Sequence, residues 1–212
     1  MKVKICGLTS TSDARMVVDA GADIAGCIVD VPVETPRKVR VGEAESIRKT
    51  VSNAGGLFCA VVMPSHAGEA VLIDRRLRPD LIQLHGLEPA DLVGEIRESV
   101  DAKVVKAVHV DDDLDMQYVL DVSEHVDFLL LDTKLDGMVG GTGVGHSLEA
   151  DREIMESTGK PCLIAGGGNA ENVKRIADLI HPYGVDASSM LEEKPGVKDP
   201  AKVNALMEAL DK

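Results

Sequence analysis

The sequence predicts an α/β protein of the (β/α)8-barrel, or TIM-barrel, class, with residues 1–212 as a single domain. Short apolar segments alternate with amphipathic segments along the whole chain, and each kind occurs eight times. The apolar segments are almost continuously hydrophobic, which is typical of parallel strands buried on both faces. Eight strand–helix units close naturally into a barrel. A doubly wound open sheet is the main alternative, but the first strand lacks the G-x-G-x-x-G turn of that class.

The predicted strands share a short, apolar and often β-branched composition. They are Lys2–Cys6, Ile24–Val29, Leu57–Val62, Leu81–Leu84, Val104–Val108, Phe128–Asp132, Cys162–Ala165 and Val185–Ala187. The predicted helices share an apolar stripe at helical spacing. They are Ser12–Ala20, Gly42–Asn53, Ala67–Arg76, Pro89–Val100, Asp113–Val122, Ser147–Ser157, Ala170–Ile180 and Ala201–Leu210. We expect Asn169 and Asp199 to cap the last two helices, the latter with Pro200 at the first helical position.

The composition limits the possible partners. With 44% hydrophobic residues the chain can bury a large core. Its formal net charge of −13 argues against nucleic acid or an anionic membrane, because both need a basic surface. An anionic substrate must therefore be held locally, by backbone N–H groups and helix N-termini. The acidity fits either a saline environment or a well-solvated surface, and the second is favoured because acidic excess is a common solubility device.

The cellular location is predicted from the apolar runs and the cysteines. No apolar run approaches the length of a membrane span, and the N-terminus lacks the regions of a signal peptide. Four cysteines lie far apart without a C-x-x-C pair, which favours a reduced, cytoplasmic protein over a disulfide framework. The six histidines show no metal-ligand spacing, so no metal is expected.

The first strand ends on a cysteine. Cys6 is followed at once by Gly7 and then by Thr9 and Ser10, which are helix N-cap candidates, so the stretch reads as strand, turn and helix. Chemistry in α/β folds lies in such strand-to-helix loops. A buried structural cysteine is the commoner interpretation of this stretch alone, and the rest of the chain reverses that preference.

Charged residues on the other strands point to the same place. Lys4 shares a strand face with Cys6, and it can pair with Asp186 because the last strand of a closed barrel adjoins the first. Structural ion pairing is the favoured interpretation for Lys4 and Lys106, which we expect inside the barrel or at its upper rim. Asp132 differs because it ends its strand, where barrel enzymes place catalytic groups.

Two features after the seventh and eighth strands suggest phosphate binding. Gly166 and Gly167 let backbone N–H groups approach an anion closely. Ser188 and Ser189 follow the last strand, and the spacing of Ser189 and Glu192 predicts a capping box on a short extra helix. The loops after these two strands form the common phosphate site of barrel enzymes.

Two further segments can border the site. His85, with Gln83, ends the fourth strand and could line the cavity, although such histidines more often bond to backbone. The glycine-rich connection 133–146 is either a mobile lid or an insertion without function.

These motifs occur in an order that resembles the phosphoribosylanthranilate isomerase family over the whole chain. The motifs are Lys4-Ile5-Cys6-Gly7, Thr35-Pro36-Arg37, Gln83-Leu84-His85-Gly86, Leu130-Leu131-Asp132-Thr133, Gly140-Gly141-Thr142-Gly143, Ala165-Gly166-Gly167, Val185-Asp186-Ala187-Ser188-Ser189 and Lys194-Pro195-Gly196-Val197-Lys198-Asp199. The resemblance implies a (β/α)8 barrel that performs an Amadori rearrangement without a cofactor. It also implies a small phosphorylated substrate, no metal, no nucleic acid or membrane partner, and a monomer or homodimer.

The resemblance also implies residue roles. Cys6 would be the general base that takes the C2′ proton, and Asp132 the general acid that opens the ribose ring. Arg37 would contact the anthranilate carboxylate. The other substrate contacts implied are Gln83, His85, Gly141 and Asp186, and the phosphate contacts are Gly166, Gly167, Ser188 and Ser189.

The residue types suit this chemistry independently. An aldose-to-ketose shift needs one group that gives a proton and one that accepts a proton. A thiolate can act as base if its pKa is lowered, and the nearby Lys4 is the candidate for lowering the pKa of Cys6. Asp132 must instead hold a proton, which burial favours.

The sequence departs from the family pattern at three places. Ile28-Val29-Asp30 and His146-Ser147-Leu148 stand where aromatic residues are usual, and Met190 stands where glycine is usual. These departures leave two alternatives. One is an isomerase of another phosphorylated sugar, and the other is a catalytically idle barrel that acts as a binding partner.

Overall fold

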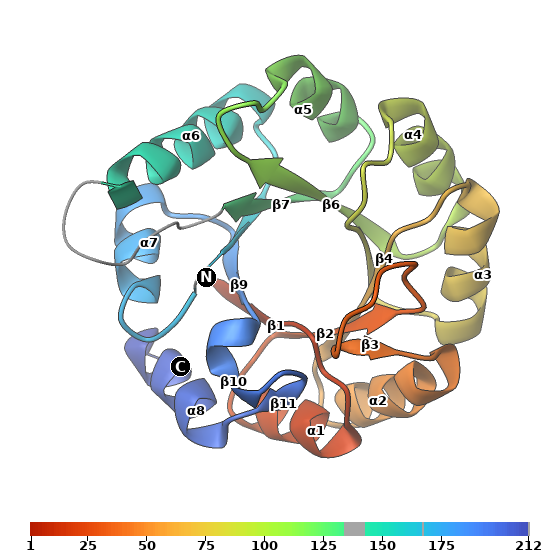
Figure 1. Ribbon diagram of the computed structural model, residues 1–212, viewed down its shortest axis with the longest axis vertical. Helices are drawn as coiled ribbons and strands as arrows, with labels where there is room; N and C mark the ends of the chain where they lie inside the picture. Colours follow the sequence, from red (N-terminus) through yellow and green to blue (C-terminus); the bar gives the residue numbers. More distant parts are fainter. Residues whose placement is uncertain (134–142, 167, 212) are drawn as a thin grey trace.

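The strands of the computed structural model, which describes residues 1–133, 143–166 and 168–211, form a closed barrel (Figure 1). The barrel strands are β1 (Lys2–Ile5), β2 (Ile24–Val29), β4 (Leu57–Val62), β5 (Leu81–Leu84), β6 (Lys103–Val110), β7 (Phe128–Thr133), β8 (Cys162–Ala165) and β9 (Gly184–Ala187). Each pairs in parallel with its neighbours, and β1 pairs with both β2 and β9, which closes the ring. The predicted fold class is confirmed.

Helices cover the outside of the barrel on all sides (Figure 1). They are α1 (Thr11–Asp19), α2 (Val41–Asn53), α3 (Ala67–Leu77), α4 (Ala90–Ser99), α5 (Met116–Ser123), α6 (Gly143–Thr158), α7 (Val173–Ile180) and α8 (Pro200–Ala209). The expected start of α8 is confirmed, because the Asp199 carboxylate accepts hydrogen bonds from the N–H groups of Ala201 and Lys202. None of the described helices is long and apolar enough to cross a membrane.

Strand alternation divides the buried residues into two layers. One layer fills the barrel interior and includes Cys59, Val105 and Leu130. The other lies between the strands and the helices and includes Val104, Leu129 and most of the helix faces. The inward-facing residue at the carboxyl end of each strand therefore lies at the mouth of the barrel.

Two of the buried lysines, Lys4 and Lys106, occupy different layers. Lys4 is fully buried inside the barrel and its Nζ lies 3.0 Å from Asp186 Oδ1, as expected for the seam between β1 and β9. Lys106 shares the strand face of Val104, so it lies on the helix side, and the expectation that it faces the interior or rim is wrong. Its ammonium pairs with Glu88 at 2.8 Å and donates to three backbone carbonyls.

The region after β9 also differs from the prediction. Ser188 precedes a short 3-10 helix η1 (Ser189–Leu191), and a hairpin of β10 (Glu192–Lys194) and β11 (Val197–Lys198) follows. The predicted capping box of Ser189 and Glu192 is wrong. Glu192 lies in β10, where its carboxylate accepts hydrogen bonds from Arg37 and Lys198 instead.

Two smaller differences concern single elements. A short strand β3 (Lys38–Val39) pairs with β2 within the long connection after that strand. Helix α7 begins at Val173 rather than Ala170, because the Asn169 side chain accepts from the N–H groups of Glu171 and Asn172 and closes a turn before the helix.

Candidate active site

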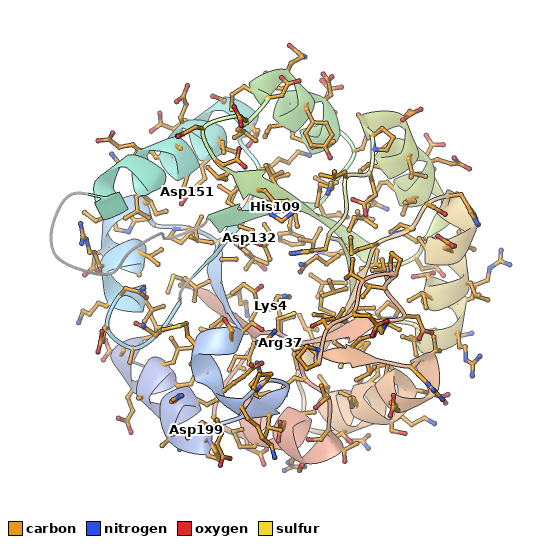
Figure 2. The ribbon with its side chains drawn as sticks, viewed as in Figure 1. Lys4, Arg37, His109, Asp132, Asp151 and Asp199 are labelled. Carbon is orange, nitrogen blue, oxygen red and sulfur yellow. The ribbon has the colours of Figure 1, made fainter. Side chains whose placement is uncertain are left out.

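A cavity of ≈ 370 Å³ opens at the carboxyl ends of the barrel strands. It is lined by every predicted site residue that the structure describes: Cys6, Arg37, Gln83, His85, Asp132, Gly166, Asp186, Ser188 and Ser189. The predictions for Gly141 and Gly167, and for the loop 134–142, fall outside the described residues. Figure 2 shows Lys4, Arg37, His109 and Asp132 around the central opening, whereas Asp151 and Asp199 lie over the outer helices.

Cys6 is fixed at the end of β1 by backbone contacts. Its N–H donates to the carbonyl of Ala187 at 2.9 Å, and the Ser188 hydroxyl donates to its carbonyl at 3.1 Å. A Cβ at Gly26 would lie 3.0 Å from the Cys6 sulfur, so the missing side chain on β2 makes room for the thiol. The sulfur therefore sits at the mouth on the seam between β1, β2 and β9.

Two opposing effects act on the Cys6 thiol. Burial raises its pKa above the ordinary value, and the nearby Lys4 ammonium lowers it without cancelling the effect of burial. Burial would lower the pKa of Lys4, but Asp186, Cys6 and Cys59 together outweigh that effect and the pKa of Lys4 is raised. Lys4 thus keeps its charge and favours the Cys6 thiolate, as expected. The pKa of Cys6 is nevertheless raised overall, because burial has the larger effect.

Asp132 lies near the end of β7 between two histidines. His85 Nε2 is 3.7 Å and His109 Nδ1 is 3.6 Å from the same carboxylate oxygen, Oδ2. The Asp132 side chain is 33% exposed, so its burial is only partial. His109 is opposite Asp132 in the register of β6 and β7.

Sequence reasoning missed His109. The predicted strand ended at Val108, two residues before β6 does, and so left His109 in a loop. Val105 and Ala107 face the barrel interior, and continuing that alternation by one more step would have placed His109 at the mouth.

Gln83 fixes the orientation of His85. The Gln83 side-chain N–H donates to His85 Nδ1 at 2.9 Å, so a neutral imidazole carries its proton on Nε2, the nitrogen that faces Asp132. Burial lowers the pKa of His85 to about 4, although Asp132 acts in the opposite direction. His85 is therefore neutral at physiological pH and presents an N–H to the carboxyl group of Asp132.

Arg37 forms the wall near β1 and β2. Its Nε donates to Glu192 Oε1 at 2.8 Å and its Nη2 to Glu192 Oε2 at 2.7 Å. Local sequence patterns do not indicate this contact, because the two residues are 155 positions apart. On the same side of the cavity, Met190 is 41% exposed and lines the cavity beside Ser188 and Ser189.

The fold and the cavity define the class of protein: a (β/α)8-barrel enzyme whose thiol and carboxyl groups share one small-molecule site at the mouth. No group of three or more His, Cys, Asp or Glu residues in the described ranges could hold a metal ion.

Comparison with known proteins identifies the family. A family profile described as "PRAI: N-(5'phosphoribosyl)anthranilate (PRA) isomerase" matches residues 3–209. The N-(5'-phosphoribosyl)anthranilate isomerase of Methanocaldococcus jannaschii is 34% identical over 223 residues, which cover 100% of this chain and 97% of that protein. This chain belongs to the N-(5'-phosphoribosyl)anthranilate isomerase family. It is an intramolecular oxidoreductase that converts phosphoribosylanthranilate to 1-(o-carboxyphenylamino)-1-deoxyribulose 5-phosphate in tryptophan biosynthesis.

Solved structures agree with this assignment. Phosphoribosyl anthranilate isomerase from Thermotoga maritima has a TM-score of 0.85 and 29% identity, and the match covers 100% of this chain and 98% of that one. A family structure in complex with the reduced form of the product has a TM-score of 0.82 and 28% identity, with the same coverage. The family assignment therefore favours the isomerase over the two alternatives that the sequence left open.

Proposed function

We propose that Cys6 is the general base and Asp132 the general acid of this isomerisation. The observation that carries the proposal is that both side chains line one cavity, from the ends of β1 and β7. These strands are separated in the ring by β9 and β8, so a ligand in the cavity has one group on each side. Acid–base groups placed in this way can act on neighbouring atoms of a single sugar.

The first step opens the ribose ring. Asp132 gives its proton to the ring oxygen, the bond from that oxygen to C1′ breaks, and the nitrogen lone pair forms a C1′=N iminium. Asp132 is left as a carboxylate. The neutral His85, with its Nε2–H facing Asp132, supports this step because a hydrogen-bond donor stabilises the carboxylate that forms.

The second step moves the hydrogen from C2′. The Cys6 thiolate takes the C2′ proton, and the C–H electrons form a C1′=C2′ double bond while the iminium electrons return to nitrogen. The resulting enolamine takes a proton at C1′ from the Cys6 thiol and gives its C2′ hydroxyl proton to the Asp132 carboxylate, which forms the ketose and restores both side chains. Lys4 stabilises the thiolate that this step requires.

The remaining contacts place the substrate. We assign Arg37 to the anthranilate carboxylate, and Gly166 with Ser188 and Ser189 to the phosphate. Their positions on the cavity wall support this, and the reduced product bound by a family member carries both a carboxylate and a phosphate.

Location and assembly are part of the proposal. We assign a cytoplasmic location, which the four free cysteines support. The chain is expected to be a monomer or a homodimer, and the Thermotoga maritima relative is described as dimeric.

Two substitutions test the acid–base pair. Cys6→Ser and Asp132→Asn should each lower kcat by roughly a hundredfold or more, the scale of general acid–base catalysis. Matched controls are Cys162→Ser, a buried thiol outside the cavity, and Asp111→Asn, an exposed carboxylate just beyond β6. Near-normal turnover in both active-site variants would refute the assignment.

A further inference from the structure

Arg37 is held by a buried carboxylate rather than left to solvent. Its guanidinium makes a two-point contact with Glu192, whose side chain is only 4% exposed. Parallel hydrogen bonds of this kind fix the plane of the guanidinium as well as its position. Among the described residues, Glu192 is the acceptor that the Arg37 side chain uses, which leaves Nη1 without a protein acceptor, and Arg37 lines the cavity.

A second cation keeps Glu192 from neutralising Arg37. Lys198 Nζ lies 3.1 Å from Glu192 Oε1 and also donates to the Ser188 carbonyl at 3.0 Å. The side chain of Lys198 is fully buried. The hydrogen bonds from Arg37 and Lys198 hold the pKa of Glu192 below its ordinary value, against the effect of burial. One carboxylate is therefore shared by two cations, and the cluster keeps an excess of positive charge in a protein with a net charge of −13.

The stem of Arg37 is also confined. Gly7 has φ +79, and a Cβ there would lie 2.9 Å from Arg37 Cδ. On the other side, Gly196 in the β10–β11 turn approaches the Pro36 carbonyl so closely that a Cβ would lie 2.8 Å from it. The hairpin thus holds both the residue before Arg37 and its guanidinium.

We infer that Glu192 is a positioning residue which makes this site selective for carboxylate-bearing substrates, by holding Arg37 with its unused N–H edge toward the cavity. The inference rests on the proposed assignment of Arg37 to the anthranilate carboxylate. A guanidinium that is already fixed loses less conformational freedom when it meets a planar carboxylate. Glu192 itself does not touch the substrate.

The test compares two ligands that differ only in the carboxylate. They are reduced 1-(o-carboxyphenylamino)-1-deoxyribulose 5-phosphate and its counterpart without the ring carboxylate. Glu192→Gln should raise the Kd of the carboxylated ligand by about ten- to hundredfold, the scale of a hydrogen bond to a charged group. The Kd of the ligand without the carboxylate should not change.

Further variants separate geometry from charge. Glu193→Gln removes the same charge from the neighbouring, exposed position of β10 and should change neither Kd. Glu192→Asp keeps the charge beside Lys198 but is too short to meet both guanidinium nitrogens, and it should show the same selective loss as Glu192→Gln. Circular dichroism melting verifies that each variant is folded.

The outcomes distinguish the possible failures. Equal weakening of both ligands by Glu192→Gln, or no weakening, would overturn the inference. Tighter binding of the carboxylated ligand would overturn it too, because Glu192 would then compete with the substrate for Arg37. Arg37→Lys should also act selectively on the carboxylated ligand. If instead it weakened both ligands equally, the assignment of Arg37 would fail together with the inference.

Discussion

Replacing Lys4 with Met tests whether the buried ion pair inside the barrel supports the fold, the base or both. Lys4 and Asp186 are 3.0 Å apart, with side chains 0% and 9% exposed. At this distance the attraction is about 5.5 kcal/mol for an effective dielectric constant of about 20. Removing one partner of a buried pair costs about 3–5 kcal/mol, so Lys4→Met should lower the free energy of unfolding by about this amount at neutral pH.

The loss should shrink in acid. Burial raises the pKa of Asp186, and Lys4 is the main group that lowers it. In Lys4→Met the pKa of Asp186 should therefore lie further above its value in the unfolded chain. The folded variant then binds a proton at pH values where the unfolded chain is still ionised. Its stability therefore rises as the pH falls through the raised pKa of Asp186. The double variant Lys4→Met/Asp186→Asn, which has no buried charge at this pair, should recover most of the lost stability at neutral pH.

Catalysis should not recover in the double variant. Lys4 is the main group that lowers the pKa of Cys6, so its removal should raise that pKa. The rise of kcat/KM with pH that reports deprotonation of Cys6 should then occur at higher pH, and the rate at neutral pH should fall. Burial raises the pKa values of Cys59 and Cys162 to about 12, so these two thiols stay protonated over the pH range of such a profile.

The chain suits both measurements. It contains no Trp, so urea unfolding is followed by circular dichroism, and the fluorescence of the anthranilate group reports turnover without tryptophan background. Full activity with an unchanged pH profile in the double variant would show that Lys4 is purely structural. Wild-type stability of Lys4→Met at neutral pH would refute the energetic reasoning.

Three further predictions concern single residues around the mouth. Gly7→Ala should cost roughly 1–2 kcal/mol for the left-handed backbone and raise KM, because the new methyl group displaces the Arg37 stem 2.9 Å away; urea unfolding and steady-state kinetics measure the two effects. Met190→Gly should lower KM severalfold, because it clears a half-exposed side chain from the cavity wall, and an unchanged KM would show that Met190 turns away from bound phosphate. His109→Ala should reduce kcat about tenfold, equivalent to about 1.4 kcal/mol, by removing one of the two imidazoles beside Asp132; a rate equal to that of the unchanged enzyme would exclude a role for His109.

The features of the fold that sequence predicted are those that depend on local patterns. Apolar runs between amphipathic segments located all the barrel strands, and Asp199 with Pro200 located the start of α8. Closure into a ring followed from the number of units, and with it the pairing of Lys4 with Asp186 across the seam. Side-chain alternation then placed Cys6 and Asp132 at one mouth.

The errors arise where a distant residue competes for a local interaction. Ser189 and Glu192 have the spacing of a capping box, but the Glu192 carboxylate gains more from a charged, two-point contact with Arg37 and from Lys198. Lys106 lies in a strand, where side chains alternate between the interior and the helix side. Nothing in the local sequence shows that its ion-pair partner, Glu88, lies on the helix side. Such choices are decided by tertiary electrostatics, which single-sequence periodicity does not contain.

The location of the site explains why its assembly and the closure of the barrel are one event. Cys6 and Arg37 come from the start of the chain, whereas Asp186 and Glu192 come from its end. These segments meet along the seam of β1 and β9 (Figure 1) and where the β10–β11 hairpin reaches Arg37. The Lys4–Asp186 pair and the Arg37–Glu192 contact therefore form only when the end of the chain docks on its start. A substitution that loosens this seam should disrupt these two charged contacts before it disturbs the wall formed by β5, β6 and β7. Substrate affinity should therefore fall before secondary structure is lost.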